Sequence, residues 1–217
     1  MQLVWYGHSC FMIKTTEGRR ILIDPFDSSI GYNTNFPKCD LITISHNHFD
    51  HSFINEVNTH TEIINSYGTF DFEFLKLKGV KSFHDDFSGL KRGPNIIYIF
   101  KFPEMSIAHL GDLGCIPDES ILAELNSLDF LIIPTGSNFT LNGTQASKLC
   151  KLLMPRYIIP MHYKTHFTNV KLSDCKDFVL SMKKITKIKS NILDLSSFDL
   201  KDNYMEVLFL KPPHLLS

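Results

Sequence analysis

The sequence predicts one α/β domain over residues 1–217, and three observations support this prediction. Short apolar segments typical of strands dominate the first half, and strands alternate with helices in the second half. No linker rich in Ser, Gly and Pro and no sequence repeat divides the chain. With 217 residues, of which 43% are hydrophobic and 21% charged, the chain has the length and composition of a globular protein with one sizeable core.

The first half contains most of the predicted strands. Runs of β-branched, aromatic and aliphatic residues that end at turn residues predict them. These strands cover residues 3–6, 11–15, 21–24, 41–45, 62–65, 70–77, 80–83, 95–102 and 106–110. Residues 16–19 predict a turn, the polar residues 26–39 predict a loop, and residues 52–57 predict a short helix.

The second half is more helical. We expect helices over residues 118–125 and 144–153, and strands over residues 130–134, 157–160 and 204–210. Ser173 has the residue type of an N-cap and predicts the start of a third helix, which would end at Lys184. This alternation places loops at strand ends, where α/β proteins carry their chemistry.

Charge and cysteine content exclude several classes of protein. The net charge of -1 gives no general attraction to nucleic acid or to an anionic membrane. The 5 cysteines are scattered and form no CxxC pair, so neither a disulfide framework nor a thiolate zinc site is expected. The sequence shows no signal peptide and no apolar run of about 18 residues. We therefore expect a cytoplasmic protein with free thiols.

A cluster of metal-ligand residue types follows the predicted strand at residues 41–45. His46, His48, Asp50 and His51 lie close together there, and imidazole and carboxylate are ligands of Zn²⁺, Fe²⁺ and Mn²⁺. Alternate residues of an extended segment face the same side, so His46 and His48 can share one ion while Asp50 and His51 turn toward a neighbouring position. The spacing favours two adjacent ions over one. The alternative is a solvated loop with fortuitous histidines.

Such a short segment cannot complete a two-metal site, so further ligands must come from other parts of the chain. Three polar residues at the ends of predicted strands are candidates. His84 follows residues 80–83, Asp112 follows residues 106–110, and His162 follows residues 157–160. Each lies where a loop leaves a strand, which is the usual position of reactive residues in this class of fold.

At these residues the sequence resembles the metallo-β-lactamase superfamily, in particular its branch of small metal-dependent hydrolases that includes ascorbate-6-phosphate lactonase-like proteins. The resemblance covers essentially the whole chain. The motifs that carry it are GHSCF at residues 7–11, ILIDPF at 21–26, SHNHFDH at 45–51, FHDD at 83–86, HLGDLG at 109–114, NFT at 138–140 and PMHY at 160–163. The most specific of them is the HxHxDH element with a later His, Asp and His in order.

The resemblance implies a fold, a ligand set and a cofactor. The fold is an αββα four-layer sandwich, in which two mixed β-sheets are flanked by helices and the site lies at one edge. The usual cofactor is a pair of zinc ions, and manganese and iron members exist; a set of His and Asp ligands does not choose among these metals. The implied ligands are His46, His48 and His84 for the first ion, Asp50, His51 and His162 for the second, and Asp112 as the bridge between them.

Three residues are expected to take part in catalysis. Asp50 would bind the second ion and would also accept a proton from the attacking water and pass it to the leaving group. The resemblance implies that Asp24 orients a ligand histidine, and the alternative is an aspartate that caps the turn before Pro25. His8 lies in a predicted turn, where it either hydrogen-bonds to substrate or is an ordinary turn residue.

Other polar residues near the motifs leave two interpretations open. Asn138 and Thr140 either line the site or belong to an ordinary turn. Tyr163 and Lys164 directly follow His162, and Lys164 either meets a substrate phosphate or carboxylate or is a solvated lysine. The remaining candidates are Lys91 and Arg92, as anion contacts or a surface turn; His109, as a packed or supporting histidine; Cys10 and Cys115, as small core residues; and His60, His166 and His214, as surface residues.

The leading functional hypothesis is a metal-dependent hydrolase that uses a hydroxide activated by two metal ions to cleave a small-molecule ester, lactone or amide. The compact chain has no large insertion for a polymer, so we expect a small-molecule substrate, no membrane partner and no nucleic-acid partner. The second hypothesis is a phosphodiesterase or nuclease with the same metal pair, which would need a basic groove or an added arm. An iron-dependent oxidoreductase and a metal-stabilised binding protein are further alternatives.

Overall fold

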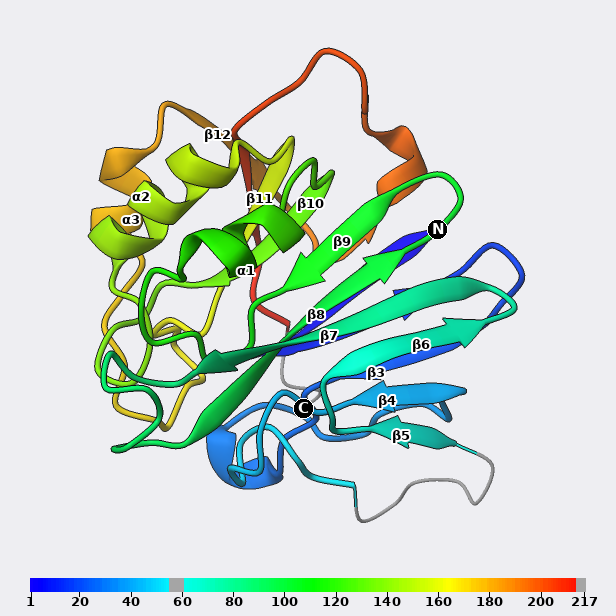
Figure 1. Cartoon of the computed structure of the whole chain (residues 1–217), viewed down its shortest axis with the longest axis horizontal. Helices are drawn as coiled ribbons and strands as arrows, with labels where there is room; N and C mark the ends of the chain where they lie inside the picture. Colours follow the sequence, from blue (N-terminus) through cyan, green and yellow to red (C-terminus); the bar gives the residue numbers. More distant parts are fainter. Residues whose placement is uncertain (55–60, 214–217) are drawn as a thin grey trace.

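The computed structural model of the chain describes residues 1–54 and 61–213. Its strands form two mixed β-sheets that pack against each other (Figure 1). The helices described are α1 (Glu119–Glu124), α2 (Gly143–Leu153), α3 (Lys176–Ser181) and the short 3-10 helices η1 (Ser28–Ile30) and η2 (Leu195–Ser197). Within these residues no helix has the length and apolar character that crossing a membrane requires.

The first sheet has six strands. In spatial order they are β13 (Ile192–Asp194), β1 (Gln2–Gly7), β2 (Cys10–Lys14), β3 (Arg20–Ile23), β4 (Leu41–Thr43) and β5 (Glu62–Ile64). β1, β2 and β3 form an antiparallel meander, and β3, β4 and β5 run parallel. The carboxyl ends of β3 and β4 therefore meet at one edge, which brings Asp24 next to the histidine cluster.

The second sheet has eight strands. In spatial order they are β12 (Lys184–Ile188), β14 (Glu206–Leu210), β11 (Tyr157–Met161), β10 (Phe130–Pro134), β9 (Ser106–His109), β8 (Pro94–Lys101), β7 (Leu75–Phe83) and β6 (Gly68–Phe72). β9, β10 and β11 are parallel, and β7 runs in their direction because two antiparallel pairings separate it from β9. The strands that precede His84, Asp112 and His162 thus end at the same edge.

The core lies between the sheets and follows from strand periodicity. In β2, Phe11 and Ile13 pack into the large core between the sheets, whereas Cys10 and Met12 join a smaller cluster on the opposite face. All five residues of β10 are buried, because this central strand is covered on both faces. Each apolar side chain removed from water in this way contributes about 1.5–3 kcal/mol.

The two outer faces are covered in different ways. Figure 1 shows α2 and α3 side by side over β10 and β11, on the side away from the first sheet. The outer face of the first sheet packs against Phe26, Ile30 and Tyr32 of the segment around η1. The predicted α/β fold with two mixed sheets is therefore confirmed, and in the described residues the helical layer over the first sheet is reduced to η1 and its flanking loop.

Two predicted elements are wrong, and a third is contradicted at the residues that the structure describes. Residues 70–77 are not one strand, because β6 ends at Phe72 and a tight hairpin turn leads into β7. α3 begins at Lys176 with Cys175 at the N-cap position, so Ser173 is not a cap, and Lys184 begins β12 instead of ending a helix. Residues 52–54 are not helical, and the rest of the predicted helix at 52–57 lies outside the described residues.

Candidate metal centre

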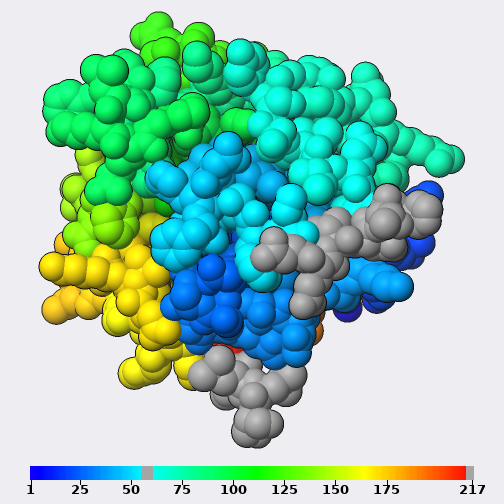
Figure 2. All heavy atoms as spheres, turned by 90° about the horizontal axis from the view of Figure 1, so that it is seen from below, coloured from blue at the N-terminus to red at the C-terminus, as the bar shows by residue number. Residues whose placement is uncertain are grey.

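The predicted ligands gather where strands of both sheets end. His8 follows β1, Asp24 follows β3, and the cluster from His46 to His51 follows β4. On the second sheet His84, Asp112 and His162 follow β7, β9 and β11. Figure 2 views this face, on which the light-blue histidine segment lies between the green segment after β7 and the yellow segment after β11. The fold thus assembles residues that are far apart in the sequence.

Asp112 lies at the centre of the cluster. Its Oδ2 is 3.1 Å from Nε2 of His84, 3.2 Å from Nε2 of His162 and 3.9 Å from Nε2 of His46. Its Oδ1 is 3.2 Å from Nε2 of His51. Metal–ligand bonds of about 2.0–2.2 Å at tetrahedral angles separate neighbouring ligand atoms by about 3.3–3.6 Å. The separations from Asp112 to His51, His84 and His162 are close to this range, whereas the separation to His46 is longer.

Three groups of ligand atoms lie within 4.8 Å of one another in the described residues. They are His46, His48 and His84; His8, Asp50, His51 and His162; and His46, His51 and Asp112. The first group matches the ligands predicted for the first ion. The second contains the ligands predicted for the second ion and adds His8, and the third places Asp112 next to ligands of both.

Buried polar atoms without partners test whether cations fit here. In the described residues Nε2 of His46, Nε2 of His51 and Oδ1 of Asp112 are buried at the cluster and make no hydrogen bond. A buried polar atom left unpaired is costly, and such atoms are rare in folded proteins. Several of them converging in one place fit a site for divalent cations bound by imidazole and carboxylate.

Asp24 and Ser45 fix which ring nitrogens face the centre. Ser45 donates its hydroxyl hydrogen to Oδ2 of Asp24 at 2.6 Å, so its oxygen is left to accept from Nδ1 of His46 at 2.9 Å. Nδ1 of His51 donates to Oδ2 of Asp24 at 2.9 Å. With Nδ1 of each ring held by these partners, both Nε2 atoms are directed toward the centre, where a metal ion would replace any proton that they carry. Asp24 thus contacts a predicted ligand, as the resemblance implied, rather than only capping a turn.

His8 and Asp50 form a buried pair. Nε2 of His8 lies 3.2 Å from Oδ2 of Asp50, and its ring centroid is 4.3 Å from that of His162. Burial, together with the nearby His162, lowers the pKa of His8 to about 4, although the contact with Asp50 acts in the opposite direction. Burial opposes ionisation of Asp50, but the charge of His51 and the contact with His8 outweigh it and lower the pKa of this carboxyl. Asp50 is therefore an ionised proton acceptor beside a neutral imidazole.

The electrostatics of the cluster suit cations. Burial, followed by the charge of His51, lowers the pKa of His46 to about 3, so this imidazole is neutral and able to bind a metal. Burial disfavours the ionised form of Asp112, but the charges of His162 and His51 outweigh it and hold the pKa of the carboxyl well below its usual range. Burial also disfavours protonation of His51, yet the charges of Asp112 and Asp50 raise its pKa well above the usual value. The carboxylates thus create a field that favours positive charge between them.

Asn95 is a supporting residue that sequence reasoning missed. Its buried Oδ1 accepts from the backbone N–H of Asp112 at 2.9 Å, and its Nδ2 donates to Ser82 Oγ and to the carbonyl of Leu110. Gly111 has a φ of 55°, and a Cβ atom there would lie 2.3 Å from Oδ1 of Asn95. Asn95 therefore holds the turn that presents Asp112. No motif marks it, because its role depends on which strand lies beside the turn.

The remaining predicted residues fall into distinct environments. His109 is buried and hydrogen-bonded to the carbonyl of Ser9 at 2.9 Å, as expected of a packed histidine. Nζ of Lys164 donates to the carbonyl of Thr168, and Nδ2 of the exposed Asn138 donates to the carbonyl of Lys171. Tyr163, Thr140 and Cys10 are buried, Cys115 is half-buried, and His166, Lys91 and Arg92 are exposed. His60 and His214 lie outside the described residues.

The fold and the site define a class of protein: an α/β protein with two mixed sheets and a cluster of His and Asp side chains at one edge. A family model described as the beta-lactamase superfamily domain matches residues 2–162. The chain belongs to this superfamily, which confirms the resemblance in its broad form. The narrower resemblance to ascorbate-6-phosphate lactonase-like proteins stays a prediction.

Known proteins resemble the chain over most of its length. A UPF0173 metal-dependent hydrolase from Methanosarcina barkeri is 29% identical over 195 residues, which cover 76% of this chain and 84% of that protein. A UPF0173 metal-dependent hydrolase from Bacillus thuringiensis is 27% identical over 197 residues, 76% of this chain and 86% of that one. A solved structure from Thermotoga maritima, assigned to the metallo-β-lactamase superfamily as a zinc-dependent hydrolase, is 29% identical, with a TM-score of 0.78 and coverage of 98% and 99%.

Proposed function

We propose that this protein is a metal-dependent hydrolase that uses two divalent cations to cleave a small-molecule ester, lactone or amide. We assign these cations as zinc. The observation that carries the proposal is the convergence of four imidazole Nε2 atoms on the Asp112 carboxylate, with buried ligand atoms that have no other partner. The names of the relatives from Methanosarcina and Bacillus support the same class of activity.

The proposed ligand set divides between two cations. His46, His48 and His84 would hold the first, Asp50, His51 and His162 the second, and Asp112 would contact both. When bound, such cations supply Lewis acidity, which polarises a substrate oxygen and makes water more acidic. Asp24 would keep His51 and, through Ser45, His46 in the required orientation.

Proton transfer is assigned to Asp50. Its Oδ2 is 3.2 Å from Nε2 of His8, so the carboxylate is fixed at the edge of the cluster in its ionised form. In the proposed reaction it accepts the proton that the attacking water loses and returns it to the leaving oxygen or nitrogen. His8 would hold Asp50 in place through their contact, which is a positioning role.

Metal analysis and a substrate screen test this proposal. The purified protein is expected to contain about two divalent ions per chain and to hydrolyse members of a panel of lactones and esters. His48→Ala and Asp112→Ala should lower the metal content and abolish hydrolysis, with circular dichroism showing that the fold is largely kept. Full activity in either variant would contradict the ligand assignment.

The same panel separates the competing functions. Cleavage of bis(para-nitrophenyl) phosphate or of single-stranded nucleic acid, without lactone or ester hydrolysis, would replace the proposal with a phosphodiesterase. Bound iron together with oxygen consumption would replace it with an oxidoreductase. We also propose a cytoplasmic location, which agrees with the 5 cysteines being free thiols. Microscopy of the tagged protein tests it.

A further inference from the structure

A pocket of about 340 Å³ lies beside the candidate metal centre. His46 and His48 line it together with Tyr67, which belongs to the segment that joins the two sheets. Two cationic side chains, Lys81 and Arg92, complete the lining, which contains no acidic residue. A pocket with this composition attracts an anion.

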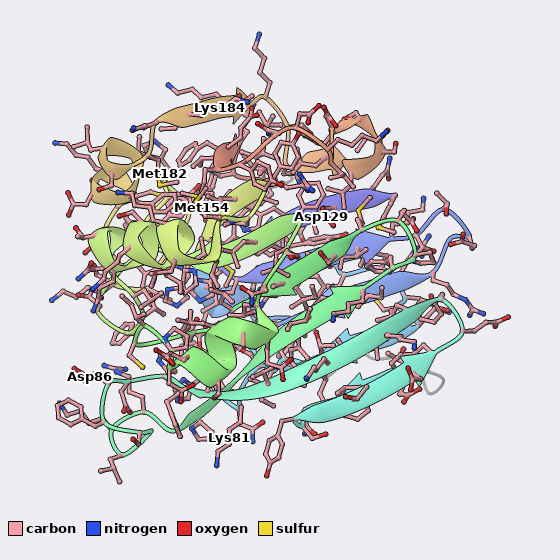
Figure 3. The ribbon with its side chains drawn as sticks, turned by 45° about the horizontal axis from the view of Figure 1, so that its top comes forward. Lys81, Asp86, Asp129, Met154, Met182 and Lys184 are labelled. Atoms are coloured by element: carbon pink, nitrogen blue, oxygen red, sulfur yellow. The ribbon has the colours of Figure 1, made fainter. Side chains whose placement is uncertain are left out.

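The two cationic side chains of the pocket, Lys81 and Arg92, differ from neighbouring lysines in whether they form ion pairs. On the same strand, β7, Lys76 and Lys78 lie 4.0 Å and 2.6 Å from carboxylates of Asp71 and Glu124. Lys81 and Arg92 have no carboxylate within 4.0 Å among the described residues. Figure 3 shows Lys81 extending away from the ribbon of β7. Their charges therefore remain available to a ligand.

Arg92 is held in place at both ends. Its backbone N–H donates to Oδ2 of Asp85 at 2.8 Å, and the same carboxylate accepts the N–H groups of Phe87, Gly89 and Lys91. Its guanidinium carbon lies 4.2 Å from the ring centroid of Phe139. An arginine stacked on an aromatic ring keeps the N–H groups at its edge free for a planar anion. Because the side chain is already ordered, binding costs little conformational entropy.

The apolar residues of the lining indicate which kind of molecule fits the pocket. Ile44, Pro94 and Ile96 supply apolar surface, and Tyr67 adds an aromatic ring. Arginine suits carboxylate and phosphate because its forked N–H groups match their oxygen atoms. The bound molecule should therefore combine an apolar or aromatic body with one anionic group.

We propose that this pocket binds the anionic group of the substrate, a carboxylate or phosphate, through Arg92 and Lys81. The apolar wall holds the body of the molecule, and the bond to be cleaved faces His46 and His48. That the bound anion belongs to the substrate rests on the proposed function. The anion site itself can be tested by binding measurements that need no catalytic activity. It also gives Asp85 and Phe139 a role, since they position Arg92.

Binding is measured by calorimetry on the zinc-loaded protein with phenyl phosphate, phenylacetate and neutral benzyl alcohol as probes. Arg92→Met should weaken binding of the anionic probes about tenfold or more, because a charge-assisted hydrogen bond is lost, and Lys81→Met should weaken it several-fold. Lys148→Met, at an exposed position of α2, is the matched control and should change nothing. The probe that loses more affinity identifies the preferred anion.

Unchanged affinity for both anions in Arg92→Met and Lys81→Met, at equal zinc content and equal thermal stability, would overturn the inference. It would mean that the metal ions alone bind the anion. Equal binding of benzyl alcohol and the anionic probes by the unmodified protein would overturn it as well.

Kinetics separate this inference from the proposed function. The two substrates are para-nitrophenyl butyrate and mono-para-nitrophenyl glutarate, which differ mainly by one carboxylate. We expect kcat/KM to be higher for the glutarate than for the butyrate. The ratio of these two kcat/KM values should fall about tenfold in Arg92→Met. If both esters are hydrolysed and neither variant changes the ratio of their kcat/KM values, the anion site is contradicted. The hydrolase proposal is then unaffected. Loss of anion binding in the variants, with no ester, lactone or amide hydrolysed by the unmodified protein, contradicts the hydrolase proposal and supports the site.

Discussion

At the scale of single residues, one buried carboxylate organises several ligands. Asp24 is fully buried and accepts from the backbone and hydroxyl of Ser45 and from Nδ1 of His51. Burial disfavours the ionised form, but the hydrogen bond and charge of His51 outweigh it and lower the pKa of the carboxyl. An ionised Asp24 raises the basicity of the ring nitrogens that face the centre.

Replacing Asp24 tests this role. Asp24→Asn keeps the size of the side chain but removes the charge and one of the two acceptor oxygens, so His51 and Ser45 lose their shared partner. We expect zinc affinity to fall about 10–100-fold, measured by competition with a chromophoric chelator. Asp71→Asn, at an exposed position of β6, is the control and should bind zinc normally. Equal zinc affinity in both variants would show that the contact of Asp24 with His51 contributes nothing to metal binding.

Whether the role of a single residue could be predicted from the sequence depended on its residue type. His46, His48, Asp50 and His51 were identified because ligand residue types seldom cluster so closely, and His84, Asp112 and His162 because they end strands. Asn95 has an ordinary residue type and acts by holding the backbone of Asp112. Arg92 depends on Asp85 and Phe139. Such contacts exist only once the chain has folded, so the sequence alone could not assign Asn95 and left Arg92 open between an anion contact and a surface turn.

At the scale of elements, buried apolar strands were predictable and exposed edge strands were not. Residues 130–134 form β10 as predicted, because all five are buried and apolar. β12 and β13 were missed, since β12 alternates Lys with Ile and Thr and both strands are mostly exposed. They become strands because β14 and β1 offer them a hydrogen-bonding edge. Pairing across the sheet, rather than local preference, determines these elements.

The start of α2 is an element whose stability can be tested alone. The Asn142 side chain accepts from the N–H of Gln145 at 2.8 Å, and the Gln145 side chain accepts from the N–H of Asn142 at 3.0 Å, which completes a capping box. Asn142→Ala should lower the free energy of unfolding by about 1 kcal/mol in urea titrations. Lys148→Ala, in the exposed part of the same helix, should change it by less than about 0.5 kcal/mol. A loss in the control as large as in Asn142→Ala would refute the capping argument.

At the scale of the whole molecule, the candidate centre joins the two sheets. His46, Asp50 and His51 come from the first sheet, and His84, Asp112 and His162 come from the second. Without cations, these elements bring buried carboxylates and unpaired imidazole atoms together. With cations bound as proposed, the same atoms would act as ligands that connect one sheet to the other. Metal binding should therefore stabilise the complete fold as well as the loops that carry the ligands.

Removal of metal tests this coupling. A ligand that binds only the folded chain, at a free concentration about a thousand times its dissociation constant, adds about 4 kcal/mol of stability. In a chain of this length, we expect chelation with EDTA to lower the thermal midpoint by roughly 10 °C, and zinc or manganese to restore it. Asp112→Ala, which lacks the carboxylate shared by the two groups of ligands, should show little difference between chelated and metal-supplemented samples. If the unmodified protein melts at the same temperature with and without EDTA after its metal has been shown to leave, the sheets are held together by their apolar core alone and the centre contributes nothing to the fold.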